Sequence, residues 1–172
     1  MPNKLLLITS LFLYHVASFS ADTELTITGK IWDNTCEIDI PSKNFTIDLG
    51  SNSSKSFLDL NQKGPKNYFD IKLSQCGNST KEMFVTFNGV QDSDNTDLLS
   101  LDKTINSADG VSILIEYDGQ KIVPINKKNA IKIELLPNQS NIIRFSATLV
   151  STKLPVKVGQ FTASANFLFE YL

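Results

Sequence analysis

The sequence has few of the side chains that bind metals or act as nucleophiles. Its 172 residues include one histidine, His15, and two cysteines, Cys36 and Cys76. A structural zinc site takes four cysteine or histidine ligands, and a nucleophilic cysteine takes a histidine base. We therefore expect no metal, no cofactor and no catalytic residues.

The chain also lacks a block of basic residues. Lysine and arginine number 16 against 18 aspartates and glutamates, a net charge of −2. A nucleic-acid surface concentrates positive charge, so that class of function is disfavoured. The acids are scattered among predicted loops, and the stretch Asp92-Ser93-Asp94-Asn95 has neither the glycine nor the closing glutamate of an EF-hand. We expect a protein that is not an enzyme and holds no calcium.

The N-terminal hydrophobic run is too short to span a bilayer comfortably. This run, residues 5–16, follows a lysine and precedes the small residues Ser18 and Ser20. That order is typical of a secretory signal cleaved after Ser20, because the two serines supply small residues at positions −3 and −1. We predict a signal peptide over residues 1–20, removal of the only histidine with it, and export of a mature protein that begins at Ala21.

Export changes what the two cysteines are expected to do. Compartments outside the cytoplasm are oxidising, so we predict a disulfide between Cys36 and Cys76. The closed loop of about 40 residues stabilises the fold by roughly 4 kcal/mol in the chain-entropy model.

The rest of the chain has the pattern of an all-β protein. Short runs alternate apolar and polar residues and are separated by glycine, proline, asparagine and aspartate. Asp118-Gly119 reads as a hairpin turn. Such spacing predicts one sandwich or barrel domain. The runs that carry the pattern are 45–49, 69–73, 83–87, 111–117, 130–136, 142–150 and 159–172.

Two amphipathic strands lie at the ends of the mature chain. One, directly after the cleavage site, has Thr23, Leu25, Ile27, Gly29 and Ile31 on one face. It either begins this domain's own sheet or completes the sheet of a different molecule, and glycine within a strand often marks close approach by another backbone. The other has an apolar face that consists of Phe161, Ala163, Ala165, Phe167, Phe169 and Tyr171.

Several local patterns together resemble the chaperone–usher fimbrial subunits, or pilins. The stretch 27–36 resembles the extension and glycine that precede their first cysteine, and 69–77 resembles the strand of their second cysteine. Residues 85–89 and 98–101 resemble their central region. Gly159 and the penultimate Tyr171 bracket a strand like the one these subunits use for chaperone and neighbour recognition.

The resemblance implies an incomplete immunoglobulin-like sandwich, residues 32–172, that lacks its final strand. It implies that the extension, residues 21–31, completes a neighbour's sheet by donor-strand exchange. Implied partners are a periplasmic chaperone, an outer-membrane usher and neighbouring subunits of a cell-surface fimbria. The implied chaperone- and neighbour-binding strand comprises Gly159, Phe161, Ala163, Ala165, Phe167, Phe169, Tyr171 and Leu172, with the Leu172 carboxylate as an anchor for basic chaperone residues.

Within the family, the opening 21–29 and the block 89–94 most resemble minor tip or adaptor subunits of type 1 fimbriae. A major rod subunit shares every motif above and remains an alternative. A glycan-binding adhesin is a weaker one, because adhesins carry a lectin domain ahead of the pilin domain. A secreted sandwich that keeps its own N-terminal strand is also open.

Overall fold

The computed structural model describes residues 28–29 and 35–172. The predicted signal peptide and most of the predicted donor strand lie outside these residues, so both remain predictions. Gly29 is the only residue of the predicted donor face that is described, and it is exposed. Within the described part of the chain, no helix is long and apolar enough to cross a membrane.

The described chain forms short strands joined by turns, with little helix, as the alternating pattern predicts. Each predicted run except 45–49 contains a strand. The elements are β1 (Glu37–Ile38), α1 (Ile40–Lys43), η1 (Ser54–Ser56), β2 (Asn67–Ser74), β3 (Glu82–Gly89), β4 (Val111–Tyr117), β5 (Lys121–Ile122), β6 (Ile131–Glu134), β7 (Asn141–Ser151) and β8 (Ala165–Tyr171). The predicted turn joins β4 to β5, where Asp118 and Gly119 both take positive φ.

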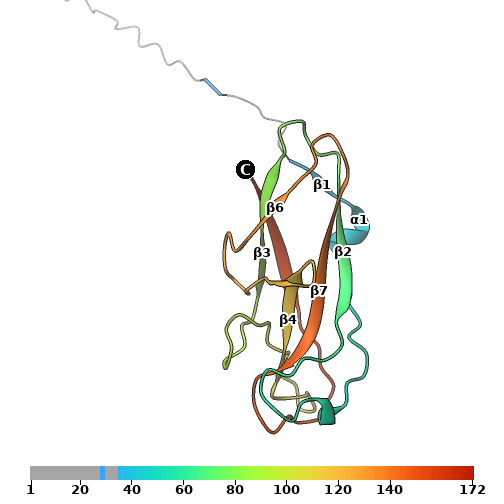
Figure 1. Ribbon diagram of the computed structural model, residues 1–172, viewed down its shortest axis with the longest axis vertical. Coiled ribbons are helices and arrows are strands. Elements are labelled where there is room, and N and C mark those ends of the chain that lie inside the picture. The colour runs from blue at the N-terminus through green and yellow to red at the C-terminus, as the bar shows by residue number, and fades with distance from the viewer. Residues whose placement is uncertain (1–27, 30–34) are drawn as a thin grey trace, which may run out of the picture. The chain divides into compact units, whose positions relative to one another are not determined.

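Two antiparallel sheets pack face to face (Figure 1). One has the order β1-β2-β7-β4-β5, and the other has the order β6-β3-β8. The long β7 lies between β2 and β4, with Phe69 opposite Phe145 and Ile115 opposite Ala147. The architecture is the predicted all-β sandwich.

The core fills the space between the sheets with alternate residues of each strand. Ile71 and Leu73 of β2, Met83 and Val85 of β3 and Phe145 of β7 have no exposed surface. Each such side chain contributes roughly 1.5–3 kcal/mol when it is fully buried. Their apolar face therefore holds the sheets together.

A buried charge on β4 is neutralised by a distant loop. Glu116 is 3% exposed, and its two oxygens lie 3.2 Å from Lys63 Nζ and 2.8 Å from Lys66 Nζ. Burial alone raises the pKa of this carboxyl, but the hydrogen bonds from both lysines outweigh burial and hold the pKa below its ordinary value. The loop that carries the lysines is thereby tied to the sheet.

Candidate functional site: an open groove between the sheets

The segment 44–50 runs along the sandwich as an extended chain without a strand partner. Ile47 and Leu49 pack against the core, as the alternation predicts, and the exposed Phe45 contacts the ring of Phe69. Among the described residues, however, no backbone hydrogen bond joins 44–50 to a strand. The prediction of a strand at 45–49 is therefore wrong, because the segment forms no hydrogen-bonded ladder with a described strand.

The last strand has one free edge. The even-numbered residues Gln160, Thr162 and Leu172 make their backbone hydrogen bonds with the loop 102–108 or with β3. Successive backbone groups of a strand point to opposite edges. The N–H and C=O groups of the odd-numbered residues, 161 to 169, consequently point away from β3, toward 44–50.

A groove of about 1220 Å³ lies between these two edges. Its walls are the segments 43–52 and 159–167. Its floor is apolar and comes from both sheets, with Phe69, Phe87, Leu99, Ile113, Ile115 and Ala147. The site therefore combines an apolar trough with unpaired backbone on both sides.

The inward face of the last strand is only half covered. Burial alternates without a break from Phe161 to Leu172, yet the inward residues are half-buried where those of β3 and β7 are fully buried. They pack on the core from one side, and the groove lies on the other.

Aromatic side chains link the two walls across the groove. The ring centroid of Phe45 lies 6.4 Å from that of Phe167 and 5.5 Å from that of Phe69. Phe167 also lies 6.2 Å from Phe87, on the floor. The groove is thus lined by aromatic rings at its Phe167 end and by the smaller residues Ala163 and Ala165 toward Gly159.

At the other end of the groove, Gly159 lets the chain pass close to the backbone of the loop 106–108. A Cβ added there would lie 2.4 Å from the Ala108 nitrogen and 2.5 Å from the Asn106 oxygen. The Gln160 N–H also donates to the Asn106 carbonyl at 3.2 Å. The pattern of the last strand singles out Gly159, but nothing in the sequence indicates the loop that packs against it.

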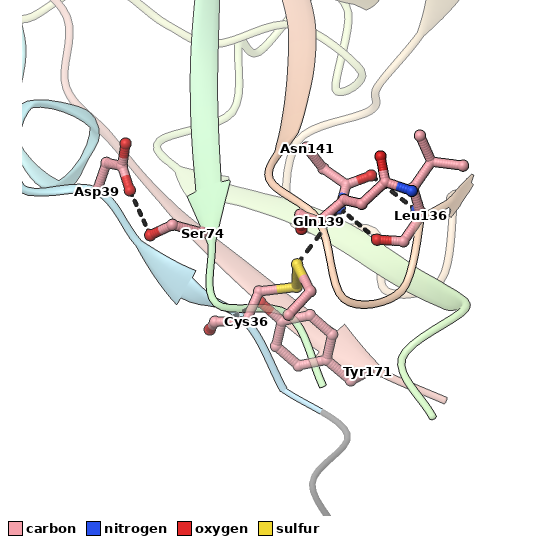
Figure 2. Close-up of a disulfide and its surroundings, with 8 residues drawn as sticks. Cys36, Asp39, Ser74, Leu136, Gln139, Asn141 and Tyr171 are labelled. Carbon is pink, nitrogen blue, oxygen red and sulfur yellow. Dashed lines mark hydrogen bonds between the residues drawn. A yellow bond between two sulfur atoms is a disulfide. The ribbon is translucent and has the colours of Figure 1, made fainter. Parts of the chain in front are cut away.

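The predicted disulfide is present and is tied to the last strand (Figure 2). Cys36 and Cys76 are bonded, and Asn141 Nδ2 donates to Cys76 Sγ at 3.3 Å. The Tyr171 hydroxyl donates to the Cys36 carbonyl at 3.3 Å, and burial raises the pKa of this phenol. Next to it, the Leu172 N–H donates to the Glu82 carbonyl, while the side chain of Leu172 is exposed. The disulfide end therefore anchors the end of β8.

The acidic stretch 92–95 forms a turn rather than an open cluster of ligands. Asp92 Oδ1 accepts the N–H groups of Asp94 and Asn95, each at 2.9 Å. Its Oδ2 accepts the Ser112 hydroxyl at 2.5 Å. Across the described residues, no group of three or more histidine, cysteine, aspartate or glutamate side chains could hold a metal ion.

A trough with two unpaired edges can bind one extended segment. Main-chain ladder bonds would supply affinity, and alternate side chains in the trough would supply specificity. The geometry offers a place for a β-strand from another chain or from residues outside the described range.

Comparison with known proteins settles the family. A family model described as "Fimbrial protein" matches residues 25–172. The chain belongs to this fimbrial family. An uncharacterized fimbrial-like protein of Escherichia coli K12, YdeS, is 38% identical over 90% of this chain and 89% of its own. The S-fimbrial protein subunit SfaG of Escherichia coli O6:K15:H31 is 35% identical over 88% of this chain and 85% of its own.

The fold is also that of a solved fimbrial subunit. The P pilus rod subunit PapA is 23% identical, with a TM-score of 0.66 over 80% of this chain and 99% of its own. The immunoglobulin-like pilin sandwich and membership of the fimbrial-subunit family, both predicted from the sequence, are confirmed.

Proposed function

We propose that this fimbrial subunit polymerises by strand donation, with the groove as the acceptor and residues 21–31 as the donor. The observation that supports this proposal is the half-covered face of the last strand beside an unpaired segment, 44–50. One inserted strand covers that face and satisfies both free edges. The donor presents Thr23, Leu25, Ile27, Gly29 and Ile31 to a neighbour's groove.

The energetics suit a filament held without covalent links. Burial of Leu25, Ile27 and Ile31 contributes roughly 1.5–3 kcal/mol each. Each ladder hydrogen bond to the free edge adds roughly 0.5–1.5 kcal/mol. Together these contacts make the strand bind tightly. Its dissociation is therefore slow, because high affinity is expressed mainly as a low off-rate.

An empty groove is a hazard before assembly. An unpaired edge above an apolar trough is a template for aggregation. We propose that a periplasmic chaperone covers the groove and contacts the strand 159–172, including the Leu172 carboxylate, until exchange occurs at an outer-membrane usher. The role is structural rather than catalytic, and the product is a fimbria on the cell surface.

Within the fimbria we assign this chain to a minor tip or adaptor position. The support is the resemblance of residues 21–29 and 89–94 to type 1 tip subunits. The distinguishing property is the length of the homopolymer: a rod subunit fills its own kind of groove repeatedly, whereas an adaptor accepts its own extension only when that extension is in excess and donates preferentially to a different subunit. Long homopolymers formed by the purified chain would make it a rod subunit instead.

The experiment is deletion of residues 23–30, with the variant co-expressed with its chaperone. The variant is expected to fold and bind the chaperone but not to insert into the preceding subunit's groove. A matched control carries Glu24→Ser and Thr26→Ser, on the opposite face of the predicted strand, and is expected to insert normally. Unfolding of the deletion variant, or loss of its chaperone complex, would assign the strand to its own core.

A further inference from the structure

Two exposed apolar side chains stand at the Gly159 end of the groove. The side chain of Ile105 is 96% exposed and that of Val158 is 74% exposed. Their segments are joined at Gly159, where Ala108 N–H donates to the Gln160 carbonyl at 2.8 Å. These loops lie at the end of the sandwich opposite the last residue (Figure 1). Neither side chain lines the groove, so a bound strand alone leaves both in water.

The direction of the inserted strand decides which part of the donor subunit lies at the Gly159 end of the groove. Antiparallel pairing is slightly more stable per residue than parallel pairing. The free edge of the last strand, from 161 to 169, is longer than the edge of 44–50, so the inserted strand forms most of its hydrogen bonds with the last strand. We therefore expect the inserted strand to run antiparallel to β8. The predicted donor face, 23–31, and the wall 159–167 are both nine residues long. Antiparallel pairing therefore puts Ile31 beside Gly159.

The donor's own folded domain must then follow closely. Only four residues, 32–35, separate Ile31 from Cys36, where the domain's disulfide lies. Five residue steps span at most about 18 Å. A domain tethered at that distance from the groove's end lies against the loops that carry Ile105 and Val158.

We propose that the surface around Ile105 and Val158 docks the disulfide end of the neighbouring subunit whose extension fills the groove. The proposal rests on the proposed function and adds a second contact to it, between folded domains. A cleft of about 480 Å³ opens beside this surface, lined by Thr104, Ser107 and Lys157 among others, and gives the neighbour's side chains a place to enter. Because the two surfaces differ, the contact is head to tail, as in an open filament.

The test compares side-chain exposure in two states by hydroxyl-radical footprinting. One state is the assembled fimbria, and the other is the full chain with its groove saturated by a peptide of residues 21–31. The peptide fills the groove without bringing a domain. Oxidation of Ile105 and Val158 is expected to fall about tenfold in the fimbria and to stay high with the peptide. Tyr68 is exposed on the outer face of the sheet that contains β2 and β7. It is the control, and its oxidation is expected to change little.

A variant provides a second readout. The double substitution Ile105→Ser and Val158→Ser is expected to leave peptide binding unchanged and to yield fimbriae that dissociate at lower temperature than the unmodified ones. Equal oxidation of Ile105 and Val158 in both states, or fimbriae of unchanged thermal stability, would overturn the docking surface while leaving strand donation intact. Failure of the peptide to bind the groove would instead count against the proposed function.

Discussion

A charge placed in the groove should abolish strand binding and spare the fold. Ala163 lines the groove and is half-buried, so the ammonium of an Ala163→Lys variant can still reach water while the groove is empty. An inserted strand removes that water. The effective cost of burying an unpaired ion in a protein is several kcal/mol. Taking about 3 kcal/mol, the affinity for a strand peptide falls on the order of 100-fold.

The assay is a calorimetric titration of the chain with a peptide of residues 21–31. Leu168→Lys is the matched control, because Leu168 belongs to the same strand, is exposed to solvent and does not line the groove. The control is expected to bind the peptide as the unmodified chain does, and both variants are expected to unfold in urea within about 1 kcal/mol of it. Equal binding by the two lysine variants would refute the assignment of the groove as the acceptor.

Three further predictions concern the fold that holds the groove. Replacing Cys36 and Cys76 by alanine is expected to lower the free energy of unfolding by about 4 kcal/mol, measured in urea against the oxidised chain. The Glu116 carboxyl has its pKa held below 4.5 in the folded state, so its contribution is complete above that pH and is lost as the pH falls through the lowered value. Glu116→Gln should therefore flatten the acid side of a plot of stability against pH, and an unchanged acid side would contradict this. Gly159→Ala is expected to cost about 1–3 kcal/mol, because the new methyl meets the Ala108 backbone; a melting temperature equal to that of the unmodified chain would argue against the close crossing.

Much of the fold could be predicted from the sequence because strand alternation and paired cysteines are local signals. The apolar face of Phe161 to Tyr171 identified the last strand, and export predicted the Cys36–Cys76 bond. Alternation was misleading at 45–49, however. It reports which face of a segment is buried, and cannot report whether a neighbouring strand exists to pair with it.

The missed features all depend on contacts between distant parts of the chain. Glu116 alternates with the core-facing Ile115 and Tyr117 of β4, and only the fold shows that Lys63 and Lys66 neutralise it. The loop that packs on Gly159, residues 106–108, lies far earlier in the chain, and its backbone fills the space that a side chain at Gly159 would need. No periodicity in the sequence connects such pairs.

The most direct test of strand acceptance is amide hydrogen exchange on the free edge of the last strand. The measurement follows the amides of Phe161, Ala163, Ala165 and Phe167 in the full chain, with and without a saturating peptide of residues 21–31. Strand acceptance predicts that these odd-numbered amides become protected while those of Gln160 and Thr162 change little. Unchanged exchange at the odd-numbered amides, with the peptide in excess, would contradict the account.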